Sequence, residues 1–319
     1  MSASHDCRVR PRPFTQVDVF GAGPFAGNPL AVVLDGEGLS EERMAAVASW
    51  TNLSETTVVL PPTDPAADYR VRILTPTGEL PFAGHPTLGT AAAWLLAGGP
   101  PRTPGVVVQE CAAGLVEVRI ESGPHLRPDD GPVASEGCLT GGAGSPLRLA
   151  FRAPALTRDT EPDGAELEAA LHVAGLDVED VVAARWTDNG PGWLSLLLRD
   201  VETLRGVRPR PSADGSAVKV GLCALTDART AAVALEVRAL LADSGVREDP
   251  VTGSLNAGLA CWLTGADAPD GGHRLTVPFE AGQGAAVGRD GRVRVSADEA
   301  GDLWIGGDVT VGVHGQILA

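Results

Sequence analysis

Two segments of the chain repeat one pattern, in which a Gly/Pro-rich loop runs directly into an Ala/Leu-rich helix. Residues 83–99 read AGHPTLGTAAAWLLAGG, and residues 247–267 read REDPVTGSLNAGLACWLTGAD. Each helical part is strongly apolar and contains a tryptophan, Trp94 or Trp262, so each predicts a buried helix. Such a helix needs cover on all sides, which curved antiparallel strands supply. The repeat therefore predicts an α+β fold of two pseudo-symmetric lobes, each a curved, mostly antiparallel sheet wrapped around a central apolar helix.

The rest of the chain fits this arrangement, because strand patterns dominate both halves. A length of 319 residues is natural for two lobes. The weakest pattern, and hence the expected linker, covers residues 121–146, so we place the lobes at 1–130 and 131–319, with terminal strands able to cross between them. Surface helices are expected at 39–52, capped by Ser40, and at 160–175. Strands are expected within 14–34, 54–60, 67–74, 106–121, 181–200, 217–226, 232–240, 273–295 and 302–318.

Charge and cysteine content narrow the classes of function. The chain has 25 Lys+Arg against 41 Asp+Glu, a net charge of −16, and no basic run. Nucleic acids and anionic membranes both reward clustered basic residues, so neither is an expected partner. The five cysteines show no metal-binding spacing, which favours a reducing, cytoplasmic setting without disulfides or structural zinc. We also find no signal-like N-terminus and no apolar run long enough to span a membrane.

The starts of the two buried helices are candidate substrate-binding sites. The first turn of a helix leaves backbone N–H groups unpaired, and together with the helix dipole they attract anions. If the lobes face each other, the two starts converge on one cleft that would hold a small carboxylate-bearing substrate. Capping alone is the competing interpretation of such starts. The candidate binding residues are Gly84, Pro86, Thr87, Thr252, Gly253 and Ser254.

Three side chains near these starts are candidates for proton transfer. His85 can donate a hydrogen bond or titrate near neutrality, although a capping or packed histidine is the simpler interpretation. Asp249, before a proline, reads equally as an N-cap or turn residue. Thr252 and Ser254 could likewise simply satisfy unpaired amides.

Glu55 is the third candidate. It leads into the apolar strand of SETTVVL (54–60), an unfavourable place for a carboxylate. Burial there would raise its pKa towards the range useful for proton transfer, with the hydroxyls of Thr56 and Thr57 available to orient it. An exposed residue at a strand edge remains the alternative.

Four motifs resemble the PhzF family, named for an isomerase of phenazine biosynthesis. They are VDVFGAGPFAGNPLAVV, NLSETTVV, RILTPTGELPFAGHPTLGTA and EDPVTGSLNAGLA. The resemblance implies a diaminopimelate-epimerase-like fold with the active site between two lobes, no cofactor or metal, and often a homodimer. It also implies that Glu55 is the acid/base, with His85, Asp249 and Ser254 as further active-site residues and Gly84 and Gly253 as substrate-binding positions.

The resemblance also bears on mechanism. Epimerases related to this family use two cysteines at the helix starts, but His85 and Asp249 stand there in this chain, and Cys111 and Cys261 lie elsewhere. Two-thiol racemisation is therefore disfavoured, and a single Glu could instead move a proton between two carbons on one face of the substrate. The chain departs from the family at residues 288–291, GRDG in place of GRPS, and at Val58, where an aromatic residue is common. We expect both departures to alter the pocket.

The sequence and this resemblance thus predict a cofactor-independent isomerase of small, cyclic carboxylates, in secondary-metabolite biosynthesis. An epimerase, dehydratase or cyclase on the same scaffold is the first alternative, and solvent-deuterium position in the product would separate these. A non-catalytic small-molecule binding protein is the second alternative. It would have no need of a buried acid such as Glu55.

Overall fold

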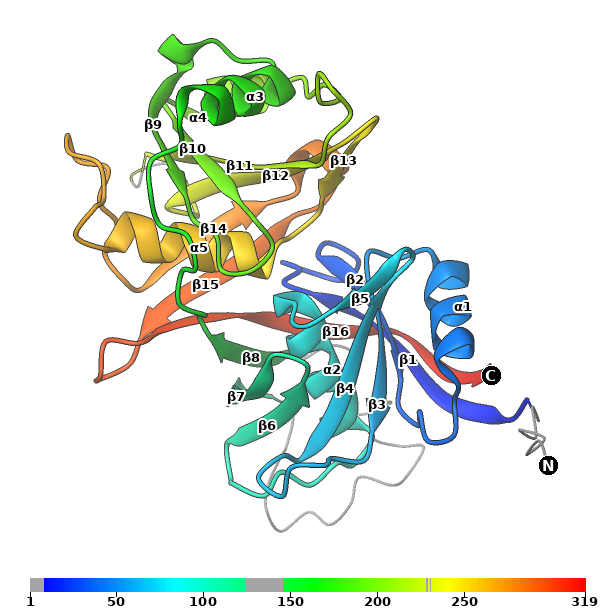
Figure 1. The fold of residues 1–319 in the computed structure, drawn as a ribbon. Coiled ribbons are helices and arrows are strands. Elements are labelled where there is room, and N and C mark those ends of the chain that lie inside the picture. Colours follow the sequence, from blue (N-terminus) through cyan, green and yellow to red (C-terminus); the bar gives the residue numbers. More distant parts are fainter. Residues whose placement is uncertain (1–8, 124–145, 228, 230) are drawn as a thin grey trace.

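The structure, a computed structural model, describes residues 9–123, 146–227, 229 and 231–319. Within these ranges the chain is a mixed α/β protein whose strands form one continuous path of pairings (Figure 1). The linker predicted for residues 121–146 lies almost entirely outside the described residues.

One group of strands surrounds the helix α2 (Gly84–Leu96), which is buried on nearly every side. This confirms the buried helix predicted from its Ala/Leu composition. A second helix, α1 (Glu41–Thr51), lies on the outside of the same group and begins where predicted, with the Ser40 hydroxyl accepting from the Arg43 amide at 3.3 Å. The strands are β1 (Pro11–Val19), β2 (Asn28–Val33), β3 (Thr56–Leu60), β4 (Tyr69–Thr75), β5 (Gly78–Leu80), β6 (Val106–Cys111), β7 (Gly114–Ser122) and β8 (Leu147–Arg152).

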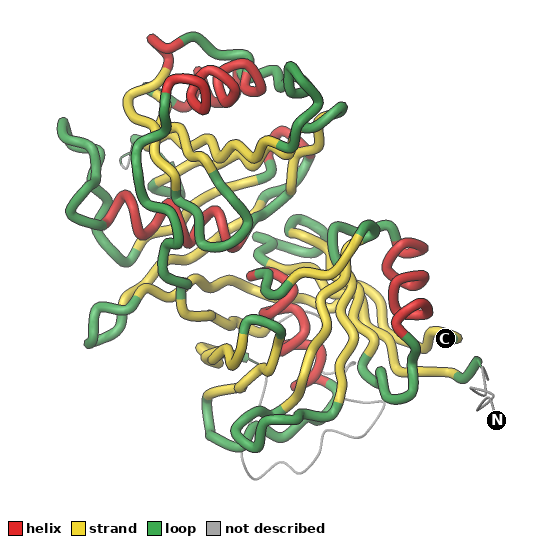
Figure 2. Tube along the Cα trace, in the orientation of Figure 1, coloured by secondary structure: helices red, strands yellow, loops and turns green. Residues whose placement is uncertain are grey.

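The other group of strands packs on α5 (Gly253–Thr264), the second predicted buried helix. The helices α3 (Gly164–Ala174) and α4 (Val201–Gly206) cover the opposite side of these strands around a separate apolar cluster (Figure 2). Two short 3-10 turns occur at Val178–Asp180 and Ala285–Val287. The strands are β9 (Val181–Trp186), β10 (Leu194–Leu198), β11 (Val218–Leu225), β12 (Leu235–Ala242), β13 (Val246–Asp249), β14 (Phe279–Gln283) and β15 (Gly291–Ala297).

The last strand, β16 (Leu303–Leu318), joins the two groups. Its first residues pair with β15, the next with β8, and its long second half with β1 near the start of the chain. Figure 1 shows this strand passing in red from one group to the other. Because β8 pairs with β7 as well as β16, the strand that follows the predicted boundary at residue 130 lies with the first group. The division into lobes at that residue stays a prediction.

The two buried helices meet at their starts. A Cβ atom placed on Gly253 would lie 3.1 Å from the Cα of Gly84, and one placed on Gly84 would lie 2.7 Å from the ring of Phe151. Glycine at both positions therefore permits a backbone approach that any side chain would obstruct. This contact brings residues 169 positions apart in the sequence to one place, where the candidate site lies.

Candidate active site

A cavity of about 1510 Å³ opens where the two helix starts meet. Pro86 and Thr87 do not line it, because both are buried inside α2, where the Thr87 hydroxyl accepts from Gln109 at 3.0 Å. The other residues predicted for the site do face this one cavity. They are Glu55, Gly84, His85, Asp249, Thr252, Gly253 and Ser254.

Neither helix start is capped by a side chain. The N-cap positions, Ala83 of α2 and Thr252 of α5, make no side-chain cap hydrogen bond. The Ser254 hydroxyl instead accepts from the indole N–H of Trp193 at 3.0 Å, so the interpretation of Thr252 and Ser254 as simple caps is wrong. Two uncapped starts with their dipoles aimed at one cavity favour a bound anion.

Glu55 stands immediately before β3 with its side chain 15% exposed. Its Oε2 atom is buried and makes no hydrogen bond with the described residues. Burial raises the pKa of Glu55 to about 8, with a further increase from the charge of Asp249 and a decrease from that of Lys219. The predicted increase in pKa is confirmed. A carboxyl group in this state can both accept and return a proton near neutral pH.

The hydroxyls expected to orient Glu55 are occupied elsewhere. Thr56 shares its hydrogen bond with the hydroxyl of Thr51 at 2.7 Å. Thr57 points into the core and accepts from Thr90 at 2.8 Å. The prediction that these two threonines orient the carboxylate is therefore wrong, because both hydroxyls are committed to other partners.

His85 lies beside Glu55, with its Nε2 atom 3.2 Å from Glu55 Oε2. The two atoms are not aligned for a hydrogen bond, and each lacks another partner among the described residues. Burial lowers the pKa of His85 to about 3, so the ring is neutral and the expectation of titration near pH 7 is wrong. Its Nδ1 lies 3.4 Å from Asn28 Nδ2, which also donates to Asp249 Oδ1 at 3.0 Å and to the Val251 carbonyl at 2.9 Å.

Asp249 ends β13 and is held by two donors. The Thr252 hydroxyl donates to Oδ2 at 2.5 Å, and Asn28 Nδ2 donates to Oδ1 at 3.0 Å. Burial raises the pKa of Asp249 to about 6, while these hydrogen bonds act in the opposite direction. Its carboxylate accepts no amide at the start of α5, so the N-cap interpretation is wrong. Asn28 thus contacts both His85 and Asp249, and joins the two sides of the site.

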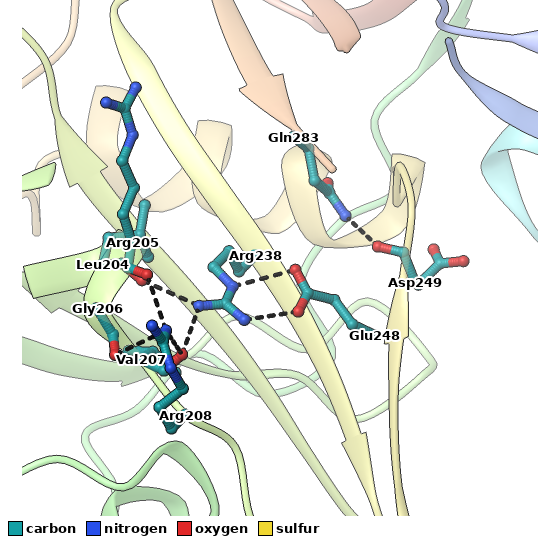
Figure 3. Close-up of polar contacts among 9 residues, drawn as sticks. All are labelled: Leu204, Arg205, Gly206, Val207, Arg208, Arg238, Glu248, Asp249 and Gln283. Atoms are coloured by element: carbon teal, nitrogen blue, oxygen red, sulfur yellow. Dashed lines mark hydrogen bonds and ion pairs between the residues drawn. The ribbon is translucent and has the colours of Figure 1, made fainter. Parts of the chain in front are cut away.

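Gln283, at the end of β14, fixes the backbone around Asp249 (Figure 3). Its Oε1 accepts from the Thr252 amide at 3.0 Å and from Asn256 Nδ2 at 2.8 Å. Its Nε2 donates to the Asp249 carbonyl at 3.0 Å and to the Thr252 hydroxyl at 2.9 Å. All four hydrogen-bonding positions of one buried amide are therefore used to hold the start of α5.

A buried ion pair holds the strand that carries Asp249. Arg238 on β12 donates to both oxygens of Glu248 on β13, at 3.1 and 2.7 Å, and both side chains are nearly inaccessible (Figure 3). The remaining nitrogen of Arg238 donates to the carbonyls of Leu204 and Val207 at the end of α4. This bidentate ion pair joins β13 to β12 at Glu248, one residue before Asp249.

Several residues of the site carry no obvious local signal in the sequence. Asn28 and Gln283 become part of it only through contacts with residues more than twenty positions away. Asn189 and Lys219 also line the cavity and come from segments that read simply as strand and loop. One signal was available for Lys219, since it is the only lysine in the chain.

The positions where the chain departs from the PhzF pattern do not line the cavity. Val58 is buried in β3 beneath α1, and Arg289 lines a separate cavity of about 730 Å³. The expectation that these departures alter the pocket is therefore wrong, because both lie outside its walls. Cys111 and Cys261 are also absent from the lining. Among the described residues no group of His, Cys, Asp and Glu could hold a metal ion, and no helix is long and apolar enough to cross a membrane.

Comparisons with known proteins agree with this fold. A structure described as a phenazine biosynthesis protein of the PhzF family from Bacillus anthracis is 23% identical, with a TM-score of 0.73 over 97% of this chain and 100% of its own. A hydroxyproline epimerase from Agrobacterium vitis is 15% identical, with a TM-score of 0.53 over 97% and 93% of the two chains. The architecture is therefore the mixed α/β fold shared with epimerases of the proline racemase kind.

The comparisons also assign the chain to a family, which is a more specific statement than its fold. The model of the family described as phenazine biosynthesis-like protein matches residues 17–315, and the chain belongs to this family. A curated relative, the trans-2,3-dihydro-3-hydroxyanthranilate isomerase of Pseudomonas aeruginosa, is 32% identical over 294 residues, covering 91% of each chain.

Proposed function

We propose that the protein is a cofactor-independent isomerase that moves a proton within a small, cyclic, carboxylate-bearing substrate. The observation that carries this proposal is the state of Glu55, a buried carboxyl group without a hydrogen-bonded partner that faces a cavity between two uncapped helix starts. A group buried at this energetic cost, and with a pKa raised towards neutrality, is typical of a catalytic acid/base.

The proton shift needs one base and one bound substrate. Ionised Glu55 takes a proton from one carbon, and the electrons of that C–H bond enter the adjacent conjugated system. The resulting carboxylic acid returns the same proton to another carbon on the same face. The raised pKa of Glu55 makes the carboxylate a better base, and leaves the acid able to give the proton back near neutral pH.

The surrounding residues position the substrate. The amides at the two helix starts, with Gly84 and Gly253 in close contact, hold the carboxylate of the substrate, and Ser254 lies beside them. Neutral His85 presents an N–H next to Glu55 and steadies the carboxylate when it forms. Asp249, rigidly held, accepts a hydrogen bond from the substrate or assists with a second proton.

The names of the relatives support the same class of reaction. The relative from Pseudomonas aeruginosa is named as an isomerase of trans-2,3-dihydro-3-hydroxyanthranilate, a cyclic carboxylate. By this relationship we place the chain in biosynthesis of the phenazine kind, acting in the cytoplasm as a homodimer of two-lobed chains. Light scattering on the purified protein tests the dimer.

The decisive test compares proton transfer by the wild-type protein with proton transfer by Glu55→Gln. Wild-type protein and the variant are incubated with trans-2,3-dihydro-3-hydroxyanthranilate in D₂O, and the product is followed by NMR. We expect wild type to move the proton and the variant to be about 10²- to 10⁴-fold slower, the usual contribution of a general acid/base. Full turnover by Glu55→Gln would refute the proposed role. Glu117→Gln, which removes another cavity-lining carboxylate, is the matched control and should retain activity.

The same experiment separates the alternatives. A hydrogen that leaves one carbon and appears at another, either as the transferred proton or as deuterium taken up from solvent, indicates isomerisation. Inversion at the original carbon indicates epimerisation, and loss of water or ring closure indicates a dehydratase or cyclase. Absence of any of these reactions with every cyclic carboxylate tested would favour a binding protein instead.

A further inference from the structure

Lys219 is the only lysine in a chain of 319 residues. All the other residues among the 25 Lys+Arg are arginines. Arginine and lysine differ in chemistry: the guanidinium is a planar fork of five donors, whereas the ammonium is a compact point charge on a flexible stem. Lys219 is therefore the one cationic side chain of the chain that is a compact ammonium and not a forked guanidinium.

This lysine lies in the wall of the cavity that Glu55 faces. It is the second residue of β11, and its side chain is half-buried. Within the described residues its ammonium makes one hydrogen bond, to the carbonyl of Pro191 at 2.8 Å, and no ion pair. An ammonium has three donors, so two of them have no partner in the part of the chain that the structure describes.

The loop that holds Lys219 also holds the start of α5. Residues 188–193 supply the Pro191 carbonyl for Lys219, and the same loop supplies Asn189 and Trp193, which donate to the carbonyl and hydroxyl of Ser254 at 2.9 and 3.0 Å. The loop is fixed by Asp188, whose carboxylate accepts from the amides of Gly190 and Gly192. Lys219 is thus set at a defined place relative to the helix start.

An unpaired cation in a partly buried wall is costly unless an anion joins it. The charges that face Lys219 are Glu55 and Asp188, and both raise its pKa, whereas burial lowers it. Neither forms an ion pair with it. Glu55 is itself buried and favours its neutral form, and Asp188 is occupied by the loop amides. The Lys219 charge is left for a ligand.

We propose that Lys219 binds a second anionic oxygen of the substrate, distinct from the carboxylate held at the helix starts. This inference rests on the proposed function for the placement of the first carboxylate. It makes molecules with two acidic oxygen groups the preferred ligands, with the second group at the wall formed by β11, and molecules with one carboxylate, such as trans-2,3-dihydro-3-hydroxyanthranilate, the weaker ones. Asn189 Oδ1, buried in the same wall without a partner among the described residues, accepts a hydrogen bond from an adjacent donor of the substrate.

The test compares ligands with one and two carboxylates. Binding of benzoate and of the three benzenedicarboxylate isomers is measured by calorimetry on the full chain. We expect at least one isomer to bind wild type about 10- to 100-fold more tightly than benzoate, as one charge-assisted hydrogen bond allows. Lys219→Met should abolish this gain and leave benzoate binding unchanged. Lys219→Arg should retain part of it.

The matched control is Arg247→Met, since Arg247 lines the same cavity and is exposed. It removes one charge from the cleft and should preserve the gain. The proposal is overturned if no isomer binds better than benzoate, if Lys219→Met weakens both ligand types equally, or if Arg247→Met has the same effect. None of these outcomes depends on turnover, so a failed proton-exchange assay remains a separate result.

A direct signal is also available because the chain has a single lysine. Reductive ¹³C-methylation produces NMR signals from Lys219 and the N-terminal amine alone, and Lys219→Arg identifies which is which. The Lys219 signal should shift with the tight-binding dicarboxylate but not with benzoate. A shift of equal size with both ligands contradicts the proposal.

Discussion

The two helix starts meet in one cavity but are built in opposite ways. At the start of α2, Glu55 Oε2 and His85 Nε2 lie 3.2 Å apart, and neither makes a hydrogen bond with the described residues. At the start of α5, Asp249 accepts from Asn28 and Thr252, and Gln283 fixes the backbone on either side. Within the described residues, the polar atoms at the start of α2 thus lack hydrogen-bond partners, whereas those at the start of α5 have several.

This difference separates two tasks of an active site. A group that moves a proton must not be locked into one protonation state by strong hydrogen bonds, even though leaving it buried and unpaired lowers stability. A group that positions the substrate gains from rigidity, which its neighbours provide. We therefore expect substitutions on the α5 side to lower both stability and activity, and loss of Glu55 to lower activity while raising stability.

The largest effect should come from Gln283→Leu, which tests the rigid side. The substitution removes four hydrogen bonds and leaves buried groups of Thr252, Asn256 and Asp249 without partners. At about 1–3 kcal/mol for each unsatisfied group, and with partial relaxation, the free energy of unfolding should fall by about 3–5 kcal/mol. Urea denaturation measures the loss, and turnover is measured well below the midpoint.

Gln109→Leu is the control for this prediction. Gln109 is also buried, it bonds Tyr69 and Thr87 at 3.0 Å, and it does not line the cavity. Its loss should lower stability and leave the activity of the folded protein intact. Equal loss of activity in the two variants would contradict a specific role of Gln283 in holding Asp249.

A smaller effect is expected from Thr252→Val, which removes one donor from Asp249. The hydroxyl at 2.5 Å lowers the pKa of Asp249, so its removal should raise that pKa by about one unit. The limb of the pH–rate profile that reports ionisation of Asp249 should move to higher pH, with kcat about 2-fold lower at neutral pH because a smaller fraction of Asp249 is ionised there. Thr264→Val removes a hydroxyl from the same helix far from the cavity, and its profile should match wild type. An unmoved profile for Thr252→Val would show that Asp249 does not titrate during turnover.

Much of the fold could be predicted from the sequence because its clearest patterns lie within short segments. The Ala/Leu composition of residues 84–96 and 253–264 indicates burial whatever surrounds it, and Ser40 caps α1 through a residue three positions away. The pairing of β16 with β1 is different in kind, since it joins the two ends of the chain. Only the completed sheet determines which strands become neighbours.

The site could be predicted from the sequence only in part, because only some of its residues belong to a local pattern. Residues at helix starts, such as Gly84 and Gly253, are recognised by a loop–helix pattern. The neutral state of His85 arises from burial by the whole fold, and the roles of Asn28 and Gln283 arise from contacts across 221 and 31 positions. No spacing rule in one sequence predicts such contacts. Pro86 and Thr87 show the converse, since their place in the motif suggested a contact that the turn of the helix directs into the core.

The most diagnostic effect is a gain in stability from Glu55→Gln. In the folded protein burial raises the pKa of Glu55 from 4.5 to about 8. Below pH 4.5 the group is neutral in both states and has no effect. As the pH rises towards 8, the unfolded chain ionises while the folded protein resists, so wild-type stability falls through this window. Glutamine removes that cost, and the variant should be more stable by at most about 4 kcal/mol at pH 8, with no difference at pH 4.

The measurement is the difference in unfolding free energy between variant and wild type at several pH values. Glu117→Gln is the control, because Glu117 also lines the cavity but its side chain is 56% exposed, so its difference should stay flat. A flat difference for Glu55→Gln as well would mean that Glu55 is ionised without cost in the folded state. The contrast between the two helix starts would then lose its energetic basis, since both sides would be equally satisfied. A difference that widens with pH would establish that the fold gives up stability to keep this one carboxyl group ready for proton transfer.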